Sequence, residues 1–542
     1  MICRFFRKGK RMKKINAKAL RKENSRLTNT IFNFTSSIGG QLITIIMQFA
    51  VRTVFIKTLG KSYLGINGLF SNVLTMLSLA ELGVGSAILY KLYKPIAEDD
   101  HKRIAVLMKF YKTVYRYIGI AVAIIGLCLI PFLPYIIKDG GKLESLGINM
   151  SFLFCLYLFK NVSSYLFFAY KTAIVKANQK EYLLNIINYF FTVGISLVQI
   201  AALLIYPNFT LYVFFMIAEV ILQNIVGGVL SDKMYPYIKN AGDDKLSREE
   251  AVGIFKDCGA LFLYKINGVV LNATDNIVIS MFLGIDYVGL YSNYYIFYTT
   301  IRTLFSKIFN SVSHSIGNLH ASNQGEHEYE IFKSINLITA ILGATAGVGV
   351  FVCGDELVNV WIGDQWLISQ PFALLMGFQI FTYAYRLILS KFRTTMGLFQ
   401  QAKFRPVAGM IINIVVSVAL VNSLGIDGVL IGTIIADWTT LMWFDPVIVY
   451  KYGFKGKYKV SEYFTKLAFN VFVTAAVGAI DYFICQNLFT GWGWISVIIH
   501  VIICAITVPT ALILCYIKSV EGKYLLKVGG RYVKKIKKAF KK

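Results

Sequence analysis

Long apolar runs are the feature of this sequence that most limits how it can fold. Charged residues, glycine, proline and asparagine divide the 542 residues into runs of roughly 20 apolar residues or more. An α-helix needs about 20 residues to cross the hydrocarbon core of a bilayer. The runs therefore predict an all-α integral membrane protein with about fourteen transmembrane helices. The predicted spans are residues 29–57, 63–91, 114–137, 146–174, 183–206, 209–231, 254–283, 287–313, 331–353, 367–390, 404–422, 426–449, 465–486 and 493–517.

The positions of lysine and arginine predict the orientation of these spans. Only 16% of the residues are charged, whereas about 25% is usual in soluble domains, yet the net charge is +27. With the N-terminus in the cytoplasm, 46 of the 56 lysines and arginines lie in cytoplasmic segments or at the adjoining helix ends, four lie outside or at the adjoining helix end, and six lie deeper within predicted helices. Cations confined to alternate loops follow the positive-inside rule. We therefore expect both termini in the cytoplasm, and no nucleic acid as a partner.

A short motif occurs twice and indicates an internal repeat. The segments LGKSYLG at residues 59–65 and LGIDYVG at residues 283–289 match at four of seven positions. Because their offset of 224 residues spans six predicted helices, an even number, both halves have the same orientation. Two parallel six-helix lobes followed by two C-terminal helices are predicted. The expected domains are a basic segment (1–28), an N-lobe (29–231), an amphipathic cytoplasmic linker (232–253), a C-lobe (254–450), the last two helices (451–517) and a basic tail (518–542).

Polar residues support the same offset. They recur every three or four positions, and so on one helix face, in both the first and the seventh span. The offset aligns Gln41 with Lys265, Thr44 with Gly268, Gln48 with Asn272, and Arg52 with Asn276. We interpret the two polar stripes as faces of a common cavity.

Six cations fall inside predicted spans, namely Arg52, Lys160, Lys265, Arg302, Lys307 and Arg386. Each costs roughly 2.5–3.5 kcal/mol at mid-bilayer, so several together must line water or pair with acids. Cations in a low-dielectric vestibule concentrate phosphate or carboxylate groups. The six residues are therefore candidates for binding an anionic substrate.

The intramembrane acids are candidate partners or ion sites. Asp275, Glu81 and Asp437 each either pair with a cation or couple transport to H⁺ or Na⁺, and Asp275 is the preferred coupling candidate because it shares the polar stripe. No other cofactor is expected. Eight scattered cysteines and five histidines show no metal-ligand spacing, so no metal site is predicted.

The sequence contains no motif that favours an enzyme over a transporter. The sequence contains no phosphate-binding GxxxxGK[ST] loop, no GxSxG and no HExxH, so no catalytic residues and no enzyme activity are predicted. A membrane-embedded polymerase stays as an alternative, although the longest predicted outer loop has only about 13 residues.

Three further features of the sequence predict contacts with the membrane or with sugars. Residues 92–113 and 232–253 mix charged and apolar positions and are expected to form amphipathic helices on the membrane surface. The basic tail is expected to contact anionic lipid, with protein binding as the alternative. Tyrosines at residues 291–298 either stack on sugars or form an interfacial belt.

Two stretches resemble a known family. SLAELGVGSAILYKLYKPIAEDD at residues 78–100 resembles the second-helix signature of the polysaccharide transporter family, within the multidrug/oligosaccharidyl-lipid/polysaccharide exporter superfamily. NATDNIVISMFLGIDYVGLYSNYYIFYTTI at residues 272–301 resembles the start of that family's second lobe.

The resemblance implies a Wzx-like flippase in the bacterial cytoplasmic membrane. Such a protein moves undecaprenyl-diphosphate-linked oligosaccharide repeat units by alternating access, for capsule, exopolysaccharide or O-antigen synthesis. Its partners would be the lipid-linked oligosaccharide, membrane lipids and other polysaccharide-assembly proteins. Arg52, Lys265 and Arg302 lie on the helices that hold the diphosphate or acidic sugars in similar proteins. A lipid II flippase, which carries several arginines in helices one and two, and a cation-coupled drug exporter are the alternatives.

Overall fold

The computed structural model describes residues 32–525, except for short stretches at 34, 38, 79–83, 139–146, 148, 240–243, 245, 322–324, 399, 403 and 489. Within these residues all regular secondary structure is helical. After the helix Thr35–Leu59 the main helices are α2 (Lys61–Leu77), α3 (Val84–Ala97), α4 (His101–Leu129), α5 (Leu133–Ile136), α7 (Met150–Leu166), α8 (Thr172–Ala177), α9 (Glu181–Ile205), α10 (Phe209–Met234), α11 (Arg248–Phe282), α12 (Ile285–Ala321), α13 (Gly325–Ile362), α14 (Phe372–Thr395), α15 (Arg405–Leu424), α16 (Ile426–Ile448), α17 (Val460–Asn487) and α18 (Trp494–Tyr516).

These helices form a multi-pass membrane protein, which confirms the predicted fold class. Ten helices in the described residues are long and apolar enough to cross a bilayer, or eleven if the bent pair Met150–Leu166 and Ala169–Ala177 is one span. α11 and α12 are long enough but do not reach this apolarity. Polar residues such as Lys265, Asp275 and Arg302 lower their mean hydropathy.

Residues 92–113 do not form a separate surface helix, because they are divided between α3 and α4, so this part of the prediction is wrong. The amphipathic linker expected at residues 232–253 stays a prediction. α4 begins at His101 and α11 begins at Arg248, so charged residues at the ends of both segments extend long helices. Extending a helix adds one hydrogen bond per residue, whereas starting a new helix is costly. The Arg103 guanidinium forms an ion pair with Glu250 across the two extensions and holds the pKa of that carboxyl below its usual range.

Asparagine and aspartate side chains fix where three of the helices begin. Asp100 accepts a hydrogen bond from the backbone N–H of Arg103 at the start of α4. Asn149 and Asn208 accept in the same way from Phe152 and Leu211, at the starts of α7 and α10. Each cap satisfies a backbone N–H that the helix leaves without a partner and stabilises it by about 1 kcal/mol.

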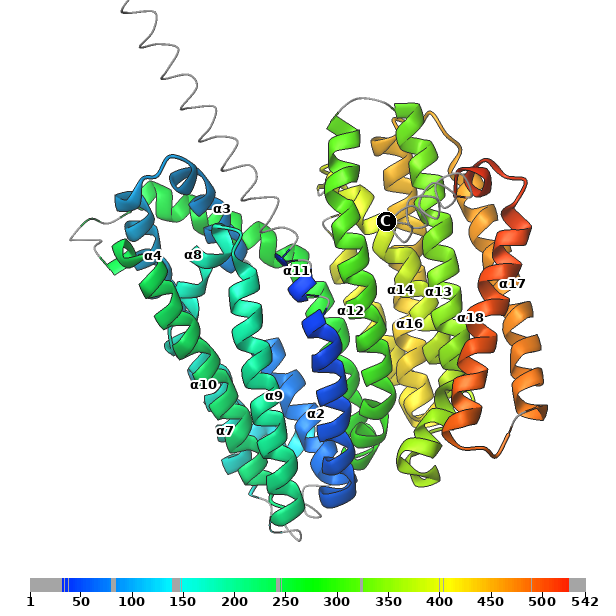
Figure 1. Cartoon of the computed structure of the whole chain (residues 1–542), viewed down its shortest axis with the longest axis horizontal. Coiled ribbons are helices and arrows are strands. Elements are labelled where there is room, and N and C mark those ends of the chain that lie inside the picture. The colour runs from blue at the N-terminus through cyan, green and yellow to red at the C-terminus, as the bar shows by residue number, and fades with distance from the viewer. Residues whose placement is uncertain are drawn as a thin grey trace, which may run out of the picture. The chain divides into compact units, whose positions relative to one another are not determined.

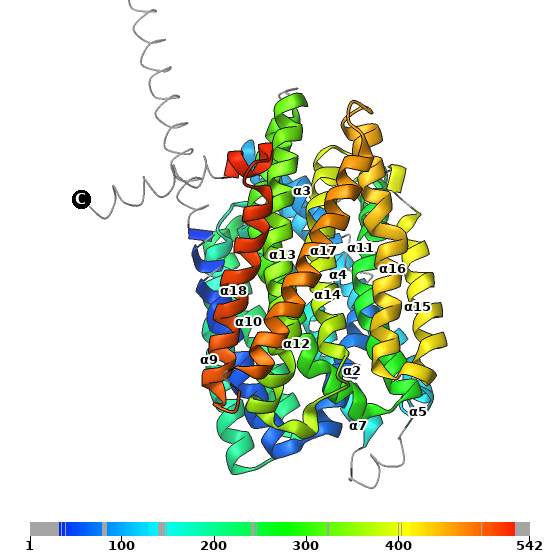
Figure 2. The ribbon, with the colours of Figure 1, turned by 90° about the vertical axis from the view of Figure 1, so that its right-hand side faces the viewer.

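The chain divides into two compact units, and each is described by itself. Unit 1 comprises residues 1–60, 73–134 and 140–266, and unit 2 comprises residues 61–72, 135–139 and 267–542. In unit 1, α7 packs against α4 and α10, and α9 packs against α10 (Figure 1). In unit 2, α14 packs against α12, α13 and α16, α15 packs along α16, and α17 and α18 pack against α13 (Figure 2). The domain boundaries expected from the sequence remain predictions.

The repeated motif forms a reciprocal contact within unit 2. Gly60 and Gly284 occupy equivalent turns, with φ values of 87° and 112° that favour glycine. A Cβ added to Gly65 would lie 2.1 Å from the carbonyl oxygen of Ile285, and one added to Gly289 would lie 2.6 Å from that of Lys61. With the offset of 224, residue 61 is equivalent to 285 and residue 65 to 289. The same pair of positions therefore meets twice, as at a twofold axis.

A hydrogen bond lies between two further equivalent positions. The Ser62 hydroxyl donates to the Asp286 carboxylate at 2.6 Å, and these residues are themselves 224 apart. Equivalent residues can meet only on or near the axis that relates them. The contact is therefore that expected of the parallel repeat.

Replacing Gly65 with alanine tests this contact. The added methyl group would overlap a backbone carbonyl that cannot rotate away, so the first turns of α2 and α12 must separate. We expect a loss of about 1–3 kcal/mol in stability, measured as a lower apparent melting temperature of the purified protein. Gly68→Ala is the matched control, because its Cβ would meet the nearest atom at 3.6 Å, an ordinary contact. Equal melting temperatures for the two variants would contradict the close approach.

A candidate anion-binding network in the membrane

Two arginines and one aspartate form the centre of a charged network in unit 2. Arg386 of α14 donates to the Asp437 carboxylate of α16 at 2.5 Å, and the Asp437 side chain is 3% exposed. Arg302 of α12 and Arg386 lie over the ring of Tyr383, 5.3 Å and 5.4 Å from its centroid. The structure thus brings together two of the six predicted cations and one of the predicted acids. Asp437 is paired, so its role as an ion site stays a prediction.

A second buried cluster lies further along the same two helices. Asp445 of α16 forms ion pairs with Arg393 of α14 and Arg405 of α15, and all three side chains are at least nine-tenths buried. From the sequence, Arg393 is expected in a cytoplasmic loop and Arg405 at the cytoplasmic start of the span 404–422, and Asp445 is not among the predicted acids. Spacing is the signal that was missed. Arg393 follows Arg386 by seven residues and Asp445 follows Asp437 by eight, which places each pair on one helix face.

Among the described side chains of the two clusters, arginines outnumber carboxylates. Four guanidinium groups, those of Arg302, Arg386, Arg393 and Arg405, face two carboxylates. Guanidinium groups offer planar pairs of donors that match phosphate and carboxylate oxygens. A region with this balance favours an anion over a cation.

Asp275 lies in a separate hydrogen-bonded group in unit 2. Its carboxylate accepts from the hydroxyl of Tyr291 at 3.1 Å and from that of Thr433 at 3.2 Å. Asn413 donates to Thr433 at 2.8 Å and accepts from Thr274 at 3.1 Å. Asp275 itself is 3% exposed. A buried carboxyl among neutral hydroxyl and amide groups is suited to exchanging a proton or holding a small cation.

The tyrosines of α12 connect these two groups along one face of the helix. Tyr291, Tyr295 and Tyr298 follow each other with ring centroids 5.4 Å and 5.6 Å apart, and Tyr298 contacts Tyr383 at 6.1 Å. Tyr291, Tyr294 and Tyr298 are at most 3% exposed. The interfacial-belt interpretation is therefore wrong for these three residues, because a belt residue needs a side chain at the membrane surface.

Two predicted cations lie in unit 1. Arg52 is partly buried in the helix Thr35–Leu59, within electrostatic reach of Tyr212 of α10. Lys160 of α7 is partly buried and lies within electrostatic reach of Glu219 of α10. The Glu219 carboxylate also accepts from Thr192 at 2.7 Å. These charges are thus close to polar groups of their own unit.

The polar stripe of the first span is only partly enclosed. Gln41 and Thr44 are partly buried and Gln48 is exposed, and the Thr44 hydroxyl donates to the Gly40 carbonyl at 2.9 Å. Asn276, the counterpart of Arg52, is 3% exposed. The aligned positions 52 and 276 therefore differ in burial. Their shared function stays a prediction.

The structure describes only some of the remaining predicted site residues. Glu81 and the side chains of Lys265 and Asn272 lie outside the described residues. Lys307 of α12 is described and partly buried. Among the described side chains, no group of three or more His, Cys, Asp or Glu residues could hold a metal ion.

The fold is that of transporters of the MOP superfamily. The chain is similar to the lipid II flippase MurJ in an inward closed conformation, with 13% identity, a TM-score of 0.61, and coverage of 90% of this chain and 99% of that chain. It is also similar to an inward-facing multidrug resistance MATE family transporter (13% identity, TM-score 0.54, 77% and 96% covered). The eukaryotic MATE transporter AtDTX14 is a third neighbour (12% identity, TM-score 0.52, 80% and 97% covered). At these identities the likeness concerns the fold.

The sequence itself matches one family. Residues 155–371 match a family described as polysaccharide biosynthesis protein. The match and the fold together confirm the predicted resemblance to the polysaccharide transporters. No curated protein sequence matches the chain.

Neutralising Asp437 tests the central ion pair. Asp437→Asn removes the carboxylate from a buried guanidinium, and breaking a buried pair in this way costs about 3–5 kcal/mol. We expect a lower yield of monodisperse protein and a lower apparent melting temperature. The double variant Arg386→Gln/Asp437→Asn removes both charges and is expected to recover most of the loss. A double variant as unstable as the single one would show that the pair does not account for the effect.

Proposed function

We propose that this protein is a flippase for undecaprenyl-diphosphate-linked oligosaccharide repeat units in the bacterial cytoplasmic membrane. It would serve the synthesis of capsule, exopolysaccharide or O-antigen by alternating access. The observation that carries the proposal is the excess of guanidinium groups in the network of α12, α14 and α16, within a fold shared with a lipid flippase. A diphosphate is the anionic part of such a substrate.

The proposed orientation has both termini in the cytoplasm. It rests on the 46 lysines and arginines that this arrangement leaves on the cytoplasmic side, against four outside. The substrate is assembled on that side, so the protein would bind it there. Membrane lipids and other polysaccharide-assembly proteins are the proposed partners.

Arg302 is the residue that we propose to bind the diphosphate most directly. Its guanidinium lies over Tyr383 together with that of Arg386, in the part of unit 2 where the described arginines outnumber the carboxylates. A lipid II flippase would use the same chemistry on a different glycan. Because both substrates carry a diphosphate, the charge of the site does not distinguish them. Transport assays with defined lipids do.

Removing this cation should slow transport. A hydrogen bond to a charged group contributes about 1.5–3 kcal/mol, so Arg302→Ala is expected to lower the rate by about tenfold or more. The rate is measured in proteoliposomes as exposure of the lipid-linked oligosaccharide in the opposite leaflet, with lipid II compared in parallel. Lys57→Ala, which removes an exposed cation, is the control.

Lys265→Ala tests a second predicted cation, which the resemblance places on another of the diphosphate-binding helices. Unchanged transport in both Arg302→Ala and Lys265→Ala would contradict a cationic binding site. Transport of lipid II but not of the oligosaccharide lipid would favour the lipid II alternative. Transport of neither lipid would contradict the flippase proposal.

We further propose that Asp275 couples transport to a gradient of H⁺ or Na⁺. Its carboxylate is buried among hydroxyl and amide groups, with Tyr291 and Thr433 as direct partners. Asp275→Asn keeps the size of the side chain but removes the negative charge. We expect the variant to lose the stimulation of leaflet exposure that an imposed proton or sodium gradient gives. Asp427→Asn, at a partly buried position at the start of α16, is expected to keep it. Equal stimulation in wild type and Asp275→Asn would contradict the assignment.

A further inference from the structure

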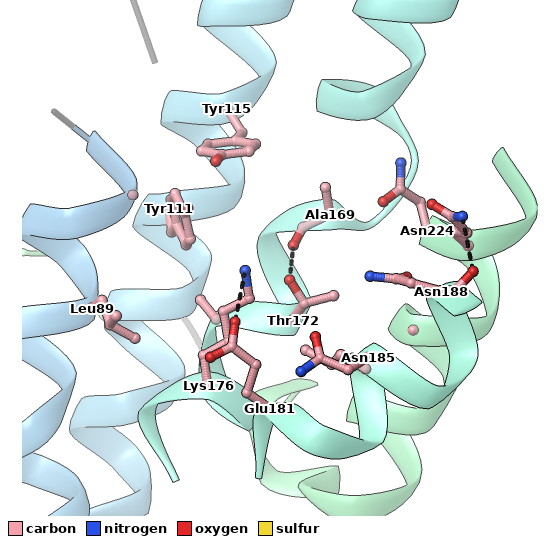
Figure 3. Close-up of a pocket in the computed structure, with 15 residues that line it drawn as sticks. Leu89, Tyr111, Tyr115, Ala169, Thr172, Lys176, Glu181, Asn185, Asn188 and Asn224 are labelled. Atoms are coloured by element: carbon pink, nitrogen blue, oxygen red, sulfur yellow. Dashed lines mark hydrogen bonds and ion pairs between the residues drawn. The ribbon is translucent and has the colours of Figure 1, made fainter. Parts of the chain in front are cut away.

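A cavity of about 600 Å³ lies within unit 1, whereas the charged network belongs to unit 2 (Figure 3). Residues of α3, α4, α8, α9 and α10 line it, all from unit 1. Its volume is within the roughly 300–1,000 Å³ typical of ligand pockets. Lys176 and Glu181, which line one end, are exposed and belong to a connection predicted to be cytoplasmic. The cavity is therefore on the side where the proposed substrate would be assembled.

Small residues leave this space open. Gly85, Ala169, Ala173 and Gly227 line the cavity from α3, from the turn before α8, from α8 and from α10. A Cβ added to Gly85 would lie 3.3 Å from the Tyr111 hydroxyl, so the aromatic wall stands directly opposite a residue without a side chain. Side chains of ordinary size at these positions would fill the volume.

Amide side chains face the cavity without partners of their own. Asn185 and Asn188 project from α9 and Asn224 from α10 (Figure 3). Within the described part of the chain, these three side chains make no hydrogen bond to another protein group. Each amide offers two donors and an acceptor with two lone pairs. Asn185 and Asn224 are partly buried and Asn188 is exposed, so their amide groups are accessible to water or to a ligand in the cavity.

The opposite wall is aromatic. Tyr111 and Tyr115 of α4 lie edge to face with centroids 4.5 Å apart, and both line the cavity. Tyrosine rings present an apolar face together with a polar tip. A flat ligand with hydroxyl groups around its edge would meet rings on one side and amides on the other.

Among the described residues that line the cavity, the charged side chains are those of Lys176 and Glu181, which form an ion pair at 3.9 Å. These two opposite charges balance each other. This differs from the network of α12, α14 and α16, where guanidinium groups outnumber carboxylates. A phosphate would gain little here, whereas a neutral ligand with many hydroxyl groups would find matching donors and acceptors.

We infer that this cavity is a binding site for neutral sugar residues of the transported lipid-linked oligosaccharide. The inference rests on the proposed function and adds a second recognition element to it. Asn185, Asn188 and Asn224 bind sugar hydroxyl groups, and Tyr111 and Tyr115 contact the apolar face of a sugar ring. The site recognises the glycan, while the arginines recognise the diphosphate.

The experiment compares two probes on the purified full-length protein in nanodiscs. One probe is undecaprenyl diphosphate, and the other is the same lipid carrying the oligosaccharide of the host strain's own polysaccharide. Wild type is expected to bind the glycosylated lipid more tightly. Asn185→Leu/Asn224→Leu keeps side-chain size but removes the amides, and should lose about tenfold of that preference. Its affinity for the bare lipid should stay within about twofold.

Matched variants separate this role from structural damage. Asn188→Leu changes an exposed side chain and should also reduce the preference for the glycosylated lipid. It serves as the test if the double variant is unstable. Asn487→Leu, an exposed asparagine at the end of α17, should leave both affinities unchanged. Arg302→Ala should weaken binding of both lipids and keep the preference for sugar.

The outcomes distinguish the two proposals. If wild type binds neither lipid, the proposed function fails and the sugar site fails with it. If wild type prefers the glycosylated lipid and both Asn185→Leu/Asn224→Leu and Asn188→Leu keep that preference, the cavity holds water only. In that case the sugar site is wrong and the flippase proposal stands.

Discussion

The need to compensate ionised side chains in a low-dielectric layer determines much of this structure. A single arginine facing acyl chains is costly, whereas an arginine with a carboxylate and an aromatic face is tolerated. Arg386 has both, with Asp437 as its acid and Tyr383 as its ring. Among the described side chains of this network, four arginines lie with two buried acids. This imbalance is the physical basis of the proposed anion site.

Close helix contact is the second requirement, and glycine meets it where the repeat motifs touch. Helices in a membrane associate through packing, since lipid tails are as apolar as their side chains. Gly65 and Gly289 let the first turns of α2 and α12 approach backbone to backbone. The hydrogen bond from Ser62 to Asp286 then adds a polar connection between equivalent positions. A repeat recognised from four matching residues thus has a direct structural consequence.

Hydropathy and spacing were sufficient to predict the helices and the repeat, but they were less informative about the charged residues. Long apolar runs predict spans because the bilayer sets a minimum length. Arg393 follows the predicted span 367–390 and Arg405 lies at the start of the predicted span 404–422, so neither was expected to be buried. Their burial depends on Asp445, which is 40 residues or more away in the sequence and meets them only through the packing of α14, α15 and α16. Pairing of this kind is tertiary information.

The position of α12 matters to both proposed sites in unit 2. Its Tyr291 donates to Asp275 near one end, and its Arg302 contacts Tyr383 three turns later. Between them Tyr295 and Tyr298 continue the row of packed rings. Tightly packed elements move between discrete arrangements and do not deform continuously. A shift of α12 that alters the hydrogen bond to Asp275 would therefore also displace Arg302. Ion binding at the proposed site of Asp275 and anion binding at the proposed site of Arg302 would then depend on each other.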